Sequence, residues 1–231
     1  MVSRFFVLLL LTGVGAIFVS LMFGYVPDDA LNLTARYYAE NTVRDTGAAN
    51  IVAAIVVTFR GLDTLGEVTV LFLTAAIVGL VLAGSQQGRL RREQPAPGEL
   101  LVTGTRLLVP LTLLLGVYVF VNGHLTPGGG FQGGAILASA ILMLLLADPL
   151  REFSHRLISV IESISGLLFV AVGLLGMVYA GGFLDNRILP LGTLGDLISA
   201  GAIPVIYSFI GLKVGAEFSS MMVNLSETEE P

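Results

Sequence analysis

The 231-residue sequence contains no cysteine and only two histidines, His124 and His155. Without cysteine the chain has no disulfide, no iron–sulfur ligation and no thiol nucleophile. A closed zinc site would need carboxylates from several segments, because two histidines alone cannot complete it. We therefore expect no metal site and no cofactor.

Charge is also scarce, since only 13% of residues are charged, about half the roughly 25% of a soluble domain. Hydrophobic residues make up 55% of the chain, and the mean hydropathy is +0.87. Too few polar groups exist to cover a water-exposed surface. This composition predicts an all-α polytopic helix bundle in membrane lipid. The net charge of −5 gives no support for nucleic-acid binding.

The hydrophobic segments predict about six transmembrane helices, because about 20 apolar residues cross a bilayer. The first segment, Phe5 to Val26, is too long for the apolar part of a signal peptide and lacks a small-residue cleavage site, so we interpret it as an uncleaved anchor. A short interfacial helix is expected at 31–42. The block 47–84 is too long for one straight crossing, at roughly 55 Å, and would make a short first crossing if divided in two. We favour a bent or half-inserted segment around 47–66 that leads into one crossing.

A proline-containing polar linker is expected at 88–106. The next 41 residues, 107–147, carry no Asp, Glu, Lys or Arg, so they must turn midway and form a hairpin of two crossings. The last two crossings are expected at 157–181 and 197–213.

Six crossings place eight of the 12 basic residues on one side of the membrane. By the positive-inside rule this side is cytoplasmic, and both termini lie there. The eight residues are Arg4, Arg89, Arg91, Arg92, Arg106, Arg151, Arg156 and Lys213. A seven-crossing alternative loses this asymmetry.

Arg60, Asp63 and Glu67 interrupt an apolar block at a spacing that aligns them on one face of a helix. Ionisable groups at membrane depth are costly and by default suggest function. One interpretation is a carboxylate pathway for protons or Na⁺, in which Glu67 lies deepest. The other is an Arg60–Asp63 pair that neutralises itself at a helix break, with Glu67 as an N-terminal helix charge.

His124 lies beside a glycine-rich turn. It could relay protons or tie the turn down by a hydrogen bond, and we favour the second interpretation. The glycines permit an unusual backbone path and close helix packing. The turn comprises Pro127, Gly128, Gly129, Gly130, Phe131, Gln132, Gly133 and Gly134.

Four further ionisable residues fall near the predicted cytoplasmic ends of the last two crossings. A proton-entry route through them is conceivable, but snorkelling side chains and ordinary surface pairing are the favoured interpretation. They are His155, Glu162, Lys213 and Glu217.

The segment Gly123-His124-Leu125-Thr126-Pro127-Gly128-Gly129-Gly130-Phe131-Gln132-Gly133-Gly134 resembles the signature turn of the MnhB-type subunit of Mrp (Mnh) multisubunit Na⁺/H⁺ antiporters. The similar subunit of energy-converting membrane-bound hydrogenases shares this turn. The resemblance covers about residues 100–225. This chain departs from the usual form at Leu125, where the family has Asn.

The segment 59–67, Phe-Arg-Gly-Leu-Asp-Thr-Leu-Gly-Glu, resembles the C-terminal portion of the large MnhA-type antiporter subunit. In hydrogenase-type complexes that portion is a separate small subunit. The resemblance covers about residues 1–85. We therefore expect a natural fusion. It consists of a two-span MnhA-like region at 1–87, a cytoplasmic linker at 88–106 and a four-span MnhB-like domain at 107–231.

These resemblances imply a non-catalytic cell-membrane subunit of a Na⁺/H⁺ antiporter module, in a stand-alone antiporter or a redox-driven complex. Its expected partners are A- and D-like proton pumps and C-, E-, F- and G-like small subunits. Glu67 matches the acidic position of the MnhA-type motif, so the resemblance implies a role for it in the Na⁺ path. The alternative is a purely structural scaffold that takes no part in conduction.

Overall fold

The structure is a computed structural model that describes all residues except 1, 26–29, 86–96, 150 and 230–231. The chain divides into two compact units, residues 1–37 and 38–231. The second unit holds most of the chain and all the candidate functional residues. The all-α polytopic architecture expected from the composition is confirmed.

The first unit contains α1 (Val2–Gly24) and the start of α2 (Leu33–Thr46). In α1 an uninterrupted apolar stretch, Arg4–Gly24, is long enough to cross a membrane, as predicted. The helix α2 replaces the expected interfacial helix at 31–42. Its start is fixed by Asn32, whose side-chain oxygen accepts a hydrogen bond from the backbone N–H of Ala35 at 2.8 Å.

In the second unit a broken segment follows α2. The chain turns at Gly47 (φ +70°) and forms α3 (Ile51–Ala54) and then the π-helix η1 (Ile55–Phe59). The stretch Ile51–Phe59 is bent by 85° from α2. This confirms the bent segment predicted around 47–66.

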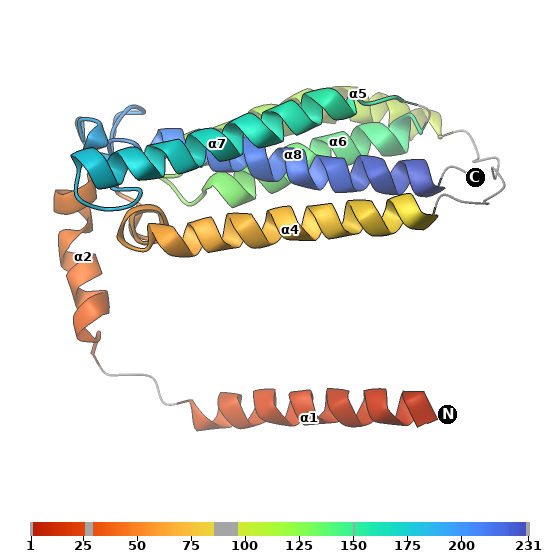
Figure 1. The fold of residues 1–231 in the computed structure, drawn as a ribbon, viewed down its shortest axis with the longest axis horizontal. Coiled ribbons are helices and arrows are strands. Elements are labelled where there is room, and N and C mark those ends of the chain that lie inside the picture. The colour runs from red at the N-terminus through yellow and green to blue at the C-terminus, as the bar shows by residue number, and fades with distance from the viewer. Residues whose placement is uncertain (1, 26–29, 86–96, 150, 230–231) are drawn as a thin grey trace. The chain divides into compact units, whose positions relative to one another are not determined.

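Five long helices form the bundle of the second unit (Figure 1): α4 (Gly61–Ser85), α5 (Glu99–Val121), α6 (Gly130–Ala147), α7 (His155–Tyr179) and α8 (Ile203–Glu229). The hairpin α5–α6 turns where the sequence predicted. The helix α5 begins at Glu99, so residues 99–106 are helical although a linker was expected there. Part of the predicted linker, 88–96, lies outside the described residues.

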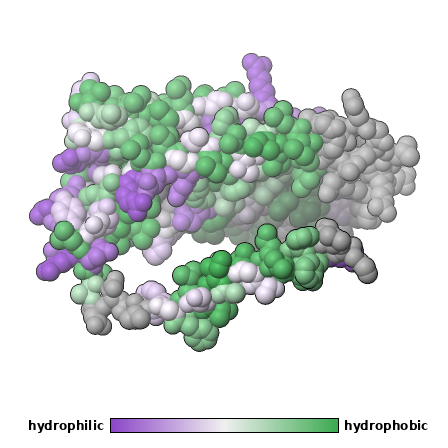
Figure 2. Space-filling model, turned by 60° about the horizontal axis from the view of Figure 1, so that its bottom comes forward, coloured by the Kyte–Doolittle hydropathy of each residue, from purple (hydrophilic) through white to green (hydrophobic). Residues whose placement is uncertain are grey.

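Five helices of the described chain are long and apolar enough to cross a membrane: α1, α4, α5, α6 and α7. Counting the bent pair formed by α2 and 51–59 as one span gives up to six. Hydrophobic side chains cover most of the visible length of the bundle, and hydrophilic ones gather at the end that carries the loops (Figure 2). This distribution is that of a bundle surrounded by lipid.

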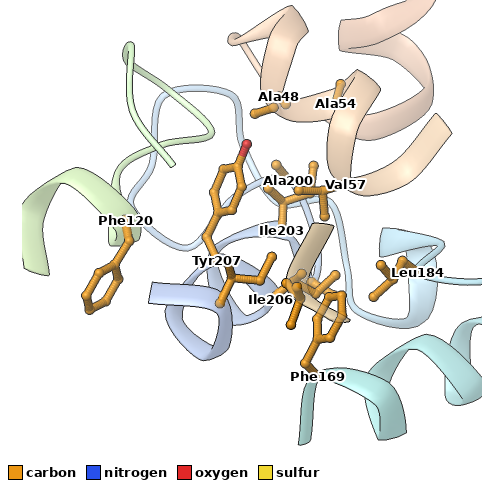
Figure 3. Packing of buried hydrophobic residues seen from close by; sticks show 14 of the residues in the cluster. Ala48, Ala54, Val57, Phe120, Phe169, Leu184, Ala200, Ile203, Ile206 and Tyr207 are labelled. Atoms are coloured by element: carbon orange, nitrogen blue, oxygen red, sulfur yellow. The ribbon is translucent and has the colours of Figure 1, made fainter. Parts of the chain in front are cut away.

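The helix α8 is the central element of the bundle, and it packs against α4, α5, α6, α7 and η1. Its buried side chains form most of the core together with Phe120, Phe169 and Val57 (Figure 3). These α8 residues are Ile203, Ile206, Tyr207, Ile210 and Val214. Because its neighbours cover it on several sides, α8 carries polar residues that a lipid-facing helix could not.

The predicted last crossing began at Leu197, but α8 begins at Ile203. Residues 180–202 instead form an irregular loop that contains one short 3₁₀ helix, Asn186–Ile188. Two buried non-glycine residues of this loop adopt left-handed backbone conformations, Leu184 (φ 59°) and Ala200 (φ 60°). Such conformations are uncommon without glycine, and here tight packing at the start of α8 holds them.

Candidate functional site

Arg60, Asp63 and Glu67 lie where the π-helix joins α4. The Arg60 guanidinium forms an ion pair with the Asp63 carboxylate 2.5 Å away, and these side chains are 61% and 52% exposed on the isolated chain. Glu67 is also exposed, about 9 Å along α4 from Gly61 at ~1.5 Å per residue. The ion pair is the contact that the structural interpretation of these charges expected.

The π-helix explains why the charges can lie there. Its wider turn interrupts the regular helix, and at Arg60 (φ −128°, ψ 38°) the backbone leaves helical geometry before α4 begins. The Thr64 hydroxyl donates a short hydrogen bond back to the Val56 carbonyl across this junction. Single-turn π-helices often occur at functional sites.

The glycine-rich turn leads into α6, and its glycines allow helices to approach closely. A Cβ at Gly130 would lie 2.5 Å from the Ile210 Cβ, and one at Gly133 would lie 2.7 Å from the Gly116 carbonyl oxygen. At Gly134 the distance to the Gly211 carbonyl oxygen would be 2.7 Å. Phe131 packs partly buried against the core. Close helix packing is therefore the role that these contacts assign to the turn.

His124 is fully buried in this turn. Its Nε2 atom lies 3.3 Å from the Asp196 carbonyl oxygen, in the loop before α8. Burial lowers the pKa of His124, although contacts with the backbone at Asp196 and Val121 oppose the shift. A lowered pKa keeps the imidazole neutral near pH 7, which suits a fixed hydrogen-bonding role better than a proton relay.

Asn50 joins the broken segment to the turn. Its side-chain amide donates to the carbonyl oxygens of Gly123 (2.8 Å) and Thr126 (3.0 Å), and its backbone N–H donates to the His124 carbonyl at 2.9 Å. The Asn50 side-chain oxygen meanwhile caps α3 by accepting from the N–H of Val52. Asn186 makes a second bridge, because its amide donates to the carbonyls of Thr46 and Ala200 at 2.7 and 2.8 Å.

We expect Asn50→Asp to lower the apparent melting temperature of the purified protein in detergent. Aspartate keeps the capping oxygen but loses both donors and places a carboxylate against the carbonyls of Gly123 and Thr126. The expected cost is about 1–3 kcal/mol, the penalty for unsatisfied buried polar groups. Asn32→Asp is the matched control, because Asn32 caps α2 through its oxygen. Equal melting temperatures for the two variants would show that the Asn50 bridge contributes nothing.

Lys213 and Glu217 form a buried ion pair in the middle of α8. The Lys213 ammonium lies 2.8 Å from Glu217 Oε1, and the side chains are only 9% and 0% exposed. The favoured prediction of snorkelling or surface pairing was wrong. The helix begins later and runs further than expected, so these residues lie at its centre, where neighbouring helices cover them.

Glu162 and Lys213 line one pocket of about 340 Å³ between α4, α7 and α8. Its other lining residues are mostly apolar and include Leu65, Val68 and Phe72 of α4. His155, the fourth residue of the predicted group, is the exposed first residue of α7. The structure therefore brings together Glu162, Lys213 and Glu217 and leaves His155 at the helix end.

No group of three or more histidine, aspartate or glutamate side chains in the described part of the chain is arranged to hold a metal ion. The charges near the pocket are those of one ammonium and two carboxylates. Such a set can exchange protons and pair charges in an apolar setting, and it offers few ligands to a divalent cation.

Comparison with known proteins confirms both resemblances. The family model of a domain related to the MnhB subunit of Na⁺/H⁺ antiporters matches residues 100–220. A second family model, MbhE of the MBH complex, matches residues 3–103. The MnhB-type subunit of the Na⁺/H⁺ antiporter of Bacillus subtilis is 38% identical over 97 residues, which cover 41% of this chain and 68% of that protein.

Two solved structures are similar over almost the whole chain. One is a chain of the membrane-bound sulfane sulfur reductase (MBS), an archaeal respiratory membrane complex. It has a TM-score of 0.81 and 40% identity, with 97% of this chain and 98% of that chain covered. The other is a chain of the Mrp complex from Dietzia sp., with a TM-score of 0.77 and 29% identity. There the match covers 97% of this chain but only 26% of the longer relative.

Proposed function

Because the chain belongs to the family of domains related to the MnhB subunit of Na⁺/H⁺ antiporters, we propose that it is a non-catalytic membrane subunit of a multisubunit antiporter module. In this proposal it contributes charged side chains to the path of Na⁺ and protons. Its partners would be A- and D-like proton-pumping subunits and small C-, E-, F- and G-like subunits. The module could act alone or within a redox-driven complex, as the similarity to a respiratory complex suggests.

The observation that carries this proposal is the position of Glu67. Its carboxylate lies on the outer surface of α4, within the stretch Gly61–Leu82 that is apolar enough to cross a membrane. A carboxylate that faced lipid at this depth would be costly. Glu67 must therefore meet a neighbouring subunit or a water-filled path, and both would arise where this chain joins its complex.

Arg60 and Asp63 would form the entrance to this path. They lie one to two turns before Glu67, at the end of the π-helix, and already neutralise each other. Irregular backbone at membrane depth is stable only where protein covers it or where it lines a water-filled cavity. The broken helix before α4 therefore favours a path over a lipid-facing surface.

We propose the cell membrane as the location, with both termini in the cytoplasm. In Figure 1 the end of the bundle with the C-terminus also carries the start of α5 and the α6–α7 connection. Arg106, Arg151 and Arg156 belong to this end. The positive-inside rule then assigns that end to the cytoplasm.

Replacing Glu67 with glutamine tests the conduction role. We expect Na⁺-dependent proton transport by inverted membrane vesicles to fall by at least tenfold, because the amide keeps the shape but removes the charge. The complex should still assemble on a native gel, since the Glu67 side chain is exposed on the isolated chain. Glu99→Gln, an exposed carboxylate at the start of α5, should transport normally. Transport by Glu67→Gln at the level of Glu99→Gln would contradict the proposal.

A scaffold role is the second candidate, and the packed glycines of α6 favour it. In that case Glu67→Gln is silent, while bulky replacement of Gly129 or Gly133 prevents assembly. A Cβ at Gly129 would lie 2.8 Å from the Gln132 side-chain oxygen. The two roles differ in the Glu67 result and agree on the glycines, so the Glu67 variant decides between them.

A further inference from the structure

The Lys213–Glu217 pair is the most deeply buried charged group in the described part of the chain. Lys213 lies about 15 Å along α8 from Ile203, at ~1.5 Å per residue. Glu217 is fully buried, and its second carboxylate oxygen, Oε2, has no hydrogen-bond partner. A buried carboxylate normally has each oxygen satisfied, so Oε2 requires an explanation.

The Lys213 side chain is held between two other helices. Its ammonium lies 4.9 Å from the ring centre of Phe72 on α4, within the range of a cation–π contact. On α7, Gly166 leaves room for the lysine stem, since a Cβ there would lie 3.2 Å from Lys213 Cδ. The ammonium therefore lies at the wall of the pocket between α4, α7 and α8.

Glu162 on α7 supplies a second carboxylate at this pocket. Its charge is close enough to act on Glu217. The helices that pack against α8 carry other ionisable residues, but among those described Glu162 alone lines the pocket with Lys213. These others are Asp63 and Glu67 of α4, Glu99, Arg106 and Tyr118 of α5, and His155, Arg156 and Tyr179 of α7. Neither α6 nor η1 has a charged residue.

One ammonium between two carboxylates leaves one net negative charge in an apolar setting. We propose that Glu217 is a proton-binding site inside this chain, loaded from water in the pocket through Glu162. A proton passes from pocket water to the Glu162 carboxylate and then to Glu217 Oε2. Lys213 keeps all its protons and turns its ammonium from Glu217 towards Glu162. The net charge of the three groups rises from −1 to 0, and release reverses each transfer.

The geometry favours a proton over a metal cation as the ligand. The Lys213 ammonium already lies 2.8 Å from Glu217 Oε1, where a metal ion would have to bind. The hydroxyl groups that line the pocket are those of Thr69 and Ser163, and Thr69 donates its hydrogen to the Leu65 carbonyl at 2.7 Å. Hard cations need a shell of several oxygen ligands, whereas a proton needs only the free Oε2.

The inference stands on different side chains from the Glu67 proposal and can succeed or fail independently. The two sites share one turn of α4, however. Leu65, Val68 and Thr69, which surround Glu67 in the sequence, line the pocket. Proton binding at Glu217 could therefore influence a cation near Glu67 through this turn.

Infrared difference spectroscopy on the purified complex tests the proposal, because a protonated carboxylic acid has a C=O band that a carboxylate lacks. Lowering the pH should produce such a band, and Glu217→Gln should remove it. Glu67→Gln and Glu152→Gln, the latter an exposed carboxylate before α7, should keep it. Glu162→Gln should keep the band but slow its appearance at least tenfold after a pH jump.

A Glu217→Asp variant guards against failure of the glutamine variant to fold. It keeps a carboxylate in a shifted position, so the band should remain at an altered frequency. Loss or displacement of the band in the Glu217 variants supports the proposal. A band that is identical in wild type, Glu217→Gln and Glu217→Asp would overturn it. So would removal of the wild-type band by Na⁺ at constant pH, because the site would then bind the metal cation.

Discussion

A Gly134→Val chain will fail to assemble into its complex. A Cβ at position 134 would lie 2.7 Å from both the Gly211 carbonyl oxygen and the Val214 Cβ on α8. Backbone atoms of a packed helix cannot move aside as a flexible side chain can. The two further methyl groups of valine would force α6 away from the central helix, and overpacking of this kind costs about 1–3 kcal/mol or more.

Native gel electrophoresis of detergent-solubilised membranes measures this effect. We expect the band of the assembled complex to disappear for Gly134→Val and to weaken strongly for Gly133→Val, which separates α5 from α6. Gly104→Val on α5 is the matched control, since a Cβ there meets nothing within 4 Å. Assembly of Gly134→Val at the control level would mean that α6 and α8 do not approach as closely as described.

Replacing Lys213 with methionine will destabilise the protein by about 3–5 kcal/mol. The change leaves the fully buried Glu217 carboxylate without its counter-charge, and breaking one partner of a buried pair has a cost of this size. Methionine fills the space along Gly166 and Phe72, so lost packing contributes little. The thermal melting temperature of the purified complex should fall accordingly, and the fall should be larger at high pH, where Glu217 is ionised.

The double variant Lys213→Met/Glu217→Gln separates charge from packing. Removing both charges of a buried pair is often neutral or stabilising, so the double variant should recover most of the lost stability. It should remain inactive if Glu217 binds a proton during transport. A double variant as unstable as Lys213→Met would show that the pair is held by packing and not by its charges.

Much of the fold followed from hydrophobic length. The charge-free stretch 107–147 had to turn, and the turn lies at the glycines that the sequence offered, between α5 and α6. The bent segment followed from a block too long for one crossing and interrupted by Arg60 and Asp63. The two family resemblances followed from short motifs at 123–134 and 59–67, and both are confirmed.

The position of α8 could not be predicted in the same way. Hydropathy locates helices that face lipid, but α8 is covered by its neighbours and tolerates Lys213 and Glu217 in its middle. The sequence therefore placed these residues at a membrane surface. An i,i+4 pair of opposite charges within an otherwise apolar helix was the available signal. Its burial depends on α4 and α7, which long-range packing alone brings together.

The bridges from Asn50 and Asn186 were equally invisible in the sequence. Asn50 contacts residues more than 70 positions away, and nothing in its local pattern distinguishes it from a solvent-exposed polar residue. Its partners are backbone carbonyls, which every residue has. Such contacts connect the MnhA-like and MnhB-like parts of the second unit, and only the three-dimensional structure reveals them.

The most direct test of the account is Na⁺ uptake by proteoliposomes that contain equal amounts of assembled complex. With a pH gradient imposed, initial uptake of radioactive Na⁺ should be at least tenfold slower for Glu67→Gln than for wild type and for Glu99→Gln. Uptake by Glu67→Gln at the wild-type rate would contradict the claim that this chain helps to carry the ion, and would leave it as a scaffold.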